Sequence, residues 1–230
     1  MNKKLTLKDG RNLSIVHLTT EQLPEILELQ ERVLGALTTG AFLQPLIEEE
    51  FLSILQGKGI MIGAYYKERL IAFRAMLEPE IDAEHLGLDA GLQDCELDKV
   101  IYSEISNVDP DFRGNGLQSL LGERIFQEVD TRRFHYICAT VAPFNIASLK
   151  DKFGLGMAIV ALKVKYGNML RYVFLKSIVQ AEKKHFAEKR LIGMEQTEEQ
   201  QRYLRDGWIG TGMEKHGDNW FVCYERSIDV

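Results

Sequence analysis

One segment constrains the fold more than any other part of this sequence: Val108-Asp109-Pro110-Asp111-Phe112-Arg113-Gly114-Asn115-Gly116-Leu117-Gln118. Before it, residues 100–108 are rich in β-branched side chains and stop short of a proline, as is typical of a strand. After it, leucine, isoleucine and valine recur on one helical face at positions 117, 120, 121, 125 and 129. The sequence therefore predicts a strand that turns into a helix directly after two glycines.

Gly114 and Gly116 stand where the first backbone N–H groups of the predicted helix have no partner and carry the positive end of its dipole. A side chain at either position would stand between these groups and an anion, whereas glycine lets a phosphate approach closely. Arg113 adds a permanent positive charge. The pattern predicts a site for a phosphate-bearing cofactor, although glycines between a strand and a helix also serve as plain turn residues.

Two known phosphate-binding patterns fit this segment poorly. No Gly-Lys-Ser/Thr follows the glycines, so it is not a Walker loop, and the third glycine of the dinucleotide fingerprint is missing. The segment instead resembles the signature Arg/Gln-x-x-Gly-x-Gly/Ala of the GNAT superfamily of acyl-CoA-dependent N-acyltransferases. Arg113 and Gly116 match this signature, and Gln118 replaces its last glycine or alanine.

A second family signature follows about thirty residues later, as the resemblance requires. Residues 134–141 read as a buried strand, and Asn145-Ile146-Ala147-Ser148 resembles the Asn-x-x-Ser/Ala helix start of the family. Phe153-Gly154-Leu155-Gly156 then resembles the closing Leu-Gly-Phe, with Met157 in place of phenylalanine. The resemblance extends from about Leu13 to Lys176.

The resemblance implies an α/β fold with a mixed, largely antiparallel central sheet flanked by helices. It implies acetyl-CoA as co-substrate, without a metal, and a pyrophosphate held by the helix amides. The coenzyme-binding residues would be Val108, Arg113, Gly114, Asn115, Gly116, Leu117, Gln118, Asn145 and Ser148. Residues 1–177 would form the acyltransferase domain. Residues 178–230 would form a C-terminal annex, a helix and a short hairpin, packed on the same domain.

The hydrophobic periodicity predicts the order strand, two helices, three strands, helix, strand, helix and two strands. A capping box of Thr19 and Gln22 precedes the first helix, and Pro45 suits the first turn of the second. Residues 60–76 and 157–175 read as hairpins, and residues 5–18 as a hairpin or a single strand. In the annex, a charged stretch precedes a capped helix at 197–205 and two strands around Gly217.

Composition narrows the classes of function. The 230 residues can bury a full core, and the net charge of −6 argues against a general nucleic-acid or anionic-membrane surface. Three cysteines without motif spacing lead us to expect no disulfide framework and a cytoplasmic location. We expect neither a signal peptide nor a membrane span, and the scattered histidines give no support to a metal site.

Residues 78–98 hold eight acidic side chains and neither lysine nor arginine. Such a run is usually a solvated loop. Because it leads into the strand beside the predicted cofactor site, the alternative is an acidic rim that concentrates a cationic amine.

Acyl transfer from a thioester to an amine needs a group that takes the amine proton and one that stabilises the departing thiolate. Glu104 is the candidate general base, because it is the only carboxylate in strand 100–108 and would share a face with Tyr102, Ser106 and Val108. The alternative is a strand glutamate that faces solvent.

The resemblance implies a tyrosine acid seven residues after Asn145, but Lys152 stands there. Tyr166 and Tyr172 are the remaining candidates, unless they are packing residues.

The sequence therefore predicts an N-acetyltransferase that moves an acetyl group from acetyl-CoA to a small cationic amine by direct attack. The alternative is a non-catalytic acyl-CoA-binding sensor or regulatory module, since the tyrosine acid is missing. The partners would be a coenzyme A thioester and an amine, with neither nucleic acid nor membrane. The annex would cover a sheet edge, close over the acceptor or form a homodimer contact.

Overall fold

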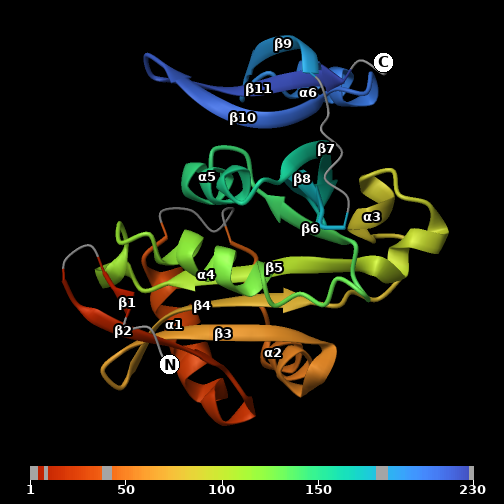
Figure 1. The fold of residues 1–230 in the computed structure, drawn as a ribbon. Helices are drawn as coiled ribbons and strands as arrows, with labels where there is room; N and C mark the ends of the chain where they lie inside the picture. The colour runs from red at the N-terminus through yellow and green to blue at the C-terminus, as the bar shows by residue number, and fades with distance from the viewer. Residues whose placement is uncertain (1–4, 8–9, 38–42, 180–185, 228–230) are drawn as a thin grey trace. The chain divides into compact units, whose positions relative to one another are not determined.

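The computed structural model describes residues 5–7, 10–37, 43–179 and 186–227. The chain divides into two compact units (Figure 1). Unit 1 comprises Met1–Pro79 and Ile101–Val129, and unit 2 comprises Glu80–Val100 and Asp130–Val230. The predicted boundary between a domain of residues 1–177 and an annex stays a prediction.

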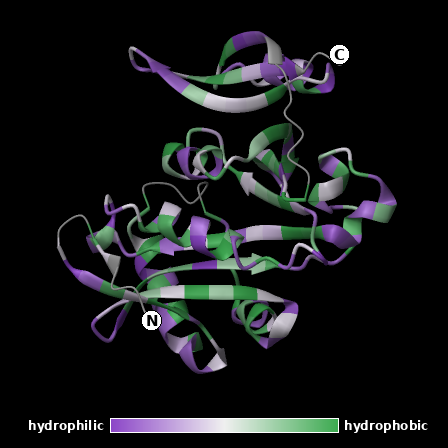
Figure 2. Ribbon diagram, in the orientation of Figure 1, coloured by the Kyte–Doolittle hydropathy of each residue, from purple (hydrophilic) through white to green (hydrophobic). Residues whose placement is uncertain are grey.

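Unit 1 is built on antiparallel strands whose order follows the sequence. They are β1 (Leu5–Thr6), β2 (Asn12–His17), β3 (Gly59–Tyr66), β4 (Arg69–Leu77) and β5 (Val100–Val108). The helical elements are η1 (Thr20–Gln22), α1 (Leu23–Gly35), α2 (Glu48–Ser53), η3 (Ile54–Lys58), η5 (Pro110–Phe112) and α4 (Leu117–Phe126). Figure 2 shows β3 mainly in green and white, which is the apolar pattern of a strand covered on both faces.

The core of unit 1 lies between the sheet and helices α1 and α2. Ile26 and Leu29 of α1 are fully buried, and Phe51 of α2 meets Phe73 of β4 edge to face, with ring centroids 5.8 Å apart. Helix α1 follows the predicted capping box, which is confirmed: the Thr19 backbone N–H donates to Gln22 Oε1 at 2.9 Å. Burial of one face of each helix therefore fixes this layer.

The second helix differs from its prediction. It begins at Glu48, so Pro45 precedes it instead of lying in its first turn. The cause is tertiary, because the buried amide of Gln30 donates to the Leu46 carbonyl at 2.9 Å and accepts from the Leu46 N–H at 3.1 Å. This pair holds the chain extended, and Glu50 then caps the helix by accepting from the Ile47 N–H at 2.8 Å.

Unit 2 also has antiparallel strand pairs, in the order β6-β8-β7-β10-β11-β9. These strands are β6 (Tyr136–Val141), β7 (Ala158–Lys165), β8 (Met169–Ser177), β9 (Phe186–Gly193), β10 (Ile209–His216) and β11 (Asn219–Ser227). The helices are α3 (Leu86–Asp89), η4 (Asp94–Lys99), α5 (Ile146–Gly154) and α6 (Thr197–Arg205). The predicted α/β class with largely antiparallel strands is confirmed.

The C-terminal segment contains one strand that the sequence analysis missed. The helix at 197–205 and the hairpin around Gly217 are confirmed as α6, β10 and β11. Strand β9, however, occupies part of the stretch that was interpreted only as charged, while residues 182–184 of that stretch lie outside the described residues. Its pairing with β11 explains the difference, since charged residues such as Glu188 and Arg226 become cross-strand partners.

A buried glutamine ties α6 to the strands of unit 2. Gln200 is fully buried, and its Oε1 accepts from the hydroxyls of Tyr172 at 2.7 Å and Tyr224 at 3.0 Å. Its Nε2 donates to the carbonyls of Gly193 and Met194. Every polar atom of the amide is thus used, as a buried amide requires. Among the helices that the structure describes, none is long and apolar enough to cross a bilayer.

Candidate functional site

The predicted strand–turn–helix unit is present in unit 1. Strand β5 ends at Val108, and α4 begins at Leu117. Gly114 and Gly116 have φ of 79° and 75°, the left-handed conformation that favours glycine. A Cβ placed on either glycine would meet no protein atom within 4 Å. A left-handed glycine turn directly before the first helix amides has the backbone form that an anion site requires.

A buried carboxylate holds the start of this loop. Asp109 is 1% exposed, and its Oδ2 accepts from Arg32 Nε of α1 at 3.1 Å and from Arg69 NH2 of β4 at 2.5 Å. Its Oδ1 accepts from the Asp111 N–H at 3.1 Å and shapes η5. Two arginines from two elements therefore fix where the glycine loop begins.

A buried arginine supports the first turn of α4. Arg74 of β4 is fully buried, and it donates to the Gln118 carbonyl at 3.2 Å and to Ser103 Oγ at 3.0 Å. Its guanidinium also lies 5.5 Å from the ring centre of Phe126. Arg74 was not predicted as a site residue, although an arginine inside the apolar run of β4 was a usable signal. It places a positive charge beneath the same helix end.

Glu104 lies at an irregularity of β5. Ala75 is opposite Ile105 and Met76 is opposite Ser103, so Glu104 is the extra residue of a β-bulge. The prediction that Glu104 shares one face of the strand with Tyr102, Ser106 and Val108 is wrong for this reason. Tyr102 is opposite Leu77 and Ser106 is opposite Arg74. Leu77 and Arg74 are three residues apart on β4 and therefore point to opposite faces of the sheet. Their cross-strand partners Tyr102 and Ser106 do the same. A bulge re-aims the side chain that it carries, and bulges are frequent beside active sites.

In unit 2 the two remaining predicted coenzyme residues lie together. Asn145 is the N-cap of α5, and its Oδ1 accepts from the Ser148 backbone N–H at 3.3 Å. The Asn-x-x-Ser pattern is thus a helix start, as the sequence predicted. Further along this helix, Lys152 is buried beside Asp151, with Nζ 3.3 Å from Oδ2.

The two tyrosines considered as general acid differ in their surroundings. Tyr172 is fully buried and donates to Gln200, and burial raises the pKa of its hydroxyl well above the usual value. It is therefore a packing residue. Tyr166 is 45% exposed at the β7–β8 turn, and its hydroxyl lies 3.1 Å from Thr140 Oγ1. Of the two tyrosines, only Tyr166 is exposed to solvent.

The acidic residues 78–98 are more ordered than a solvated loop, since they include α3 and η4. Lys165 of β7 is 6% exposed in its side chain and contacts Glu84 Oε2 at 2.7 Å and Asp89 Oδ2 at 2.9 Å. Burial alone would lower the pKa of Lys165, but hydrogen bonds to Glu84 and Asp89 outweigh it and raise that pKa. Lys163 also pairs with Asp89, at 2.6 Å.

A third acidic side chain of this segment is also bound locally. Glu96 Oε1 accepts from the Tyr136 hydroxyl at 2.6 Å, which lowers the pKa of the carboxyl and raises that of the phenol. Part of the negative charge therefore holds α3 and η4 against β6 and β7. Acidic side chains that stay exposed include Glu80, Asp94 and Asp98.

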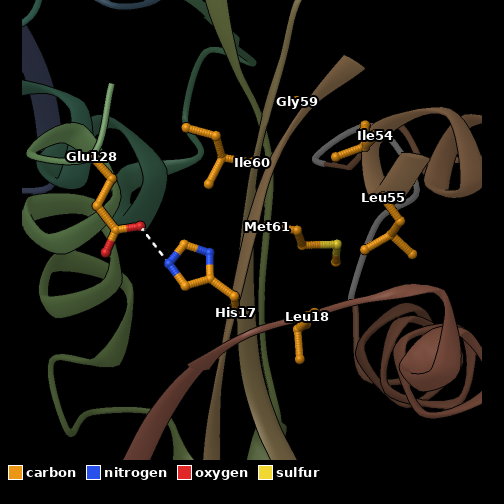
Figure 3. Close-up of a pocket in the computed structure, with 8 residues that line it drawn as sticks. All are labelled: His17, Leu18, Ile54, Leu55, Gly59, Ile60, Met61 and Glu128. Atoms are coloured by element: carbon orange, nitrogen blue, oxygen red, sulfur yellow. Dashed lines mark ion pairs between the residues drawn. The ribbon is translucent and has the colours of Figure 1, made fainter. Parts of the chain in front are cut away.

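A pocket of about 250 Å³ lies elsewhere in unit 1 (Figure 3). At its polar end, His17 Nε2 lies 3.0 Å from Glu128 Oε2, and its other walls are mainly apolar. None of its lining residues was predicted as a site residue; they are His17, Leu18, Ile54, Leu55, Gly59, Ile60, Met61 and Glu128. Across the described parts of the chain, no three His, Cys, Asp or Glu side chains gather as a metal site would require.

Neither a known protein-family profile nor a curated protein sequence matches this chain. Solved structures do. The ribosomal-protein-S18-alanine N-acetyltransferase from Escherichia coli is 17% identical, with a TM-score of 0.51 over 76% of this chain and 99% of that chain. The GNAT domain of S. lividans PAT is 16% identical, with a TM-score of 0.55 over 77% and 97%. The protein yncA from Salmonella typhimurium, solved with its cofactor acetyl-CoA, is 15% identical, with a TM-score of 0.54 over 74% and 96%.

Proposed function

Because the chain has the fold of the GNAT N-acetyltransferases, we propose that it transfers an acetyl group from acetyl-CoA to a small cationic amine. The observation that carries this proposal is the loop before α4. Two left-handed glycines directly precede the first amides of α4, a Cβ on either would meet no protein atom within 4 Å, and Arg113 adds a positive charge beside them in the sequence. This is the chemistry that a pyrophosphate needs.

In this proposal the coenzyme is bound by residues of both sequence signatures. The backbone from Arg113 to Gln118 binds the pyrophosphate, and Val108 at the end of β5 adjoins the arm that carries the thioester. Asn145 and Ser148, at the start of α5, stay the further coenzyme-binding residues that the sequence resemblance implies. When bound, the coenzyme supplies the activated acetyl group and a thiolate leaving group.

Glu104 is the proposed general base. Its place in the bulge of β5 takes it out of the regular alternation of the strand. In this role its carboxylate would accept a proton from the amine. Direct attack then needs no covalent intermediate on the enzyme. Tyr166 is the candidate that returns a proton to the departing thiolate, since Tyr172 is buried in the Gln200 network.

The charge of the acceptor is inferred from the exposed carboxylates of residues 78–98. Glu80, Asp94 and Asp98 would raise the local concentration of a cation. The alternative is an acyl-CoA sensor without turnover, which is favoured by Lys152 at the position where the resemblance implies a tyrosine. We further propose a cytoplasmic location, in keeping with three cysteines that are all unbridged.

Two measurements test the proposal. Calorimetry with acetyl-CoA measures coenzyme binding, and thiol release in the presence of a panel of amines measures turnover. Binding with amine-dependent thiol release supports the acetyltransferase. Binding without release from any amine supports the sensor, and the absence of binding refutes both.

A further inference from the structure

The pocket of unit 1 in Figure 3 has a polar end that the proposed acetyl transfer does not use. His17 ends β2, Glu128 follows α4, and His17 Nε2 lies 3.0 Å from Glu128 Oε2. Glu128 Oε1 accepts from Arg124 Nε at 3.1 Å, whereas Oε2 is buried and receives no hydrogen bond from the residues that the structure describes. The contact with His17 is therefore ionic and leaves Oε2 able to accept a hydrogen bond. A carboxylate oxygen out of reach of water normally has such a donor.

The remaining walls of this pocket are mainly apolar and come largely from η3 and β3. Ile54 and Met61 are 1% and 3% exposed, and Leu55 and Ile60 lie beside them in the lining. Ile54 and Leu55 belong to η3, a π-helical turn that continues α2, and such turns are frequent at functional sites. The pocket holds about 250 Å³. A cavity of roughly 150 Å³ accommodates benzene, and pockets for drug-sized ligands begin at roughly 300 Å³. The volume therefore suits a molecule with a single ring or a short branched chain.

The pocket and the glycine loop lie at opposite ends of two elements. Gly59 of the pocket begins β3, and the turn after β3 leads to Arg69, which binds Asp109 at the start of the glycine loop. Eight residues of strand span roughly 23 Å. Helix α4 likewise begins directly after the glycine loop and ends two residues before Glu128, a length of roughly 15 Å. A pyrophosphate on the glycine loop therefore does not fill this pocket.

The charges at the polar end favour a neutral head group on the ligand. Arg124 and His17 both approach the Glu128 carboxylate, so a ligand ammonium would meet positive charge there as well as negative. A ligand carboxylate would be repelled by Glu128 itself. A hydroxyl avoids both conflicts, because it can donate to Glu128 Oε2 and accept from His17 when Nε2 carries the ring proton.

We propose that this pocket is a second binding site, for a small neutral phenol or alcohol. Its hydroxyl lies between Glu128 and His17, and its apolar body lies against Leu55, Ile60 and Met61. Binding gives the buried carboxylate oxygen its donor and removes the apolar body of the ligand from water. The site goes beyond the proposed acetyl transfer and does not depend on it.

The test is calorimetry with 4-methylphenol and analogues that differ only in the head group. At neutral pH, 4-methylbenzylamine is a cation and 4-methylbenzoate an anion, while 4-methylanisole keeps the oxygen and cannot donate a hydrogen bond. The Kd for 4-methylphenol should be lower than that for each analogue by about tenfold or more, since only its hydroxyl donates to the carboxylate without adding a charge.

Variants of the polar end locate the binding. Glu128→Gln keeps the size of the side chain and removes the charged acceptor, so the Kd for 4-methylphenol should rise about tenfold or more. Glu123→Gln is the matched control, because it removes the same charge from an exposed position of α4 outside the pocket and should bind like the wild type. The His17 side chain is 66% exposed, so His17→Ala should fold and should also raise the Kd, which keeps the test valid if Glu128→Gln does not fold.

The outcomes separate this inference from the proposed function. The inference is overturned if 4-methylphenol does not bind, if 4-methylanisole or a charged analogue binds equally well, or if neither polar-end variant weakens binding. Competition between acetyl-CoA and 4-methylphenol would also overturn it, because the two ligands would then share one site. Binding of 4-methylphenol that saturating acetyl-CoA leaves unchanged supports a separate site. A protein that binds 4-methylphenol and not acetyl-CoA would refute the proposed function and leave this inference standing.

Discussion

Replacement of Gly116 by alanine tests the coenzyme site with a calculable cost. Gly116 is the N-cap of α4 with φ 75° and ψ 14°, and an added Cβ would meet no protein atom within 4 Å. The protein therefore suffers only the backbone strain of a non-glycine residue in the left-handed region, about 1–2 kcal/mol. For a chain of 230 residues this corresponds to a midpoint lowered by about 2–8 °C.

The effect on binding should be larger than the effect on stability. The methyl group would stand on the N-cap of α4, where the pyrophosphate is proposed to bind. Loss of one charge-assisted hydrogen bond costs about 1.5–3 kcal/mol, which corresponds to an acetyl-CoA Kd weakened roughly 10- to 150-fold. Calorimetry with acetyl-CoA measures this directly.

Gly167→Ala supplies the control for strain. Gly167 lies in the β7–β8 turn with φ 85°, and a Cβ there also meets nothing within 4 Å. Both variants should lose similar stability, but Gly167→Ala should bind acetyl-CoA like the wild type. If Gly116→Ala binds acetyl-CoA within about twofold of Gly167→Ala, the pyrophosphate does not lie on this loop and the reasoning is refuted.

Three further predictions concern the base, the acidic segment and a buried histidine. Glu104→Gln should lower the rate of thiol release by roughly 10²–10⁴ near neutral pH and recover at high pH, where the amine is already deprotonated; a normal pH profile would remove Glu104 from the mechanism. The triple change Glu80→Gln, Asp94→Asn and Asp98→Asn should raise KM for cationic amines and flatten its salt dependence, while the Kd for acetyl-CoA stays constant; unchanged amine kinetics would leave these charges no role. Burial lowers the pKa of His85, so the folded protein favours the neutral imidazole. The contribution of His85 to the free energy of unfolding should therefore be complete above about pH 6.5 and decline as the pH falls below that value. Thermal midpoints measured against pH should show this decline in the wild type and not in His85→Gln.

The sequence by itself determined the elements whose signals are local. The strand at 100–108, the helix after Gly116 and the capping box of Thr19 each depend on side chains within a few residues of one another. The glycine loop was predictable for the same reason. A left-handed backbone before a helix is a property of the residues that form it.

Only the tertiary structure decided features that depend on distant partners. The bulge at Glu104 is a matter of register between β4 and β5, and no alternation within β5 reveals it. Strand β9 exists because β11 pairs with it, and Tyr172 is a packing residue because Gln200 reaches its hydroxyl. That Glu128 Oε2 receives no hydrogen bond from any described residue is likewise visible only in three dimensions. Hydrogen-bond satisfaction depends on every group that surrounds a buried atom, and the sequence does not say which groups those are.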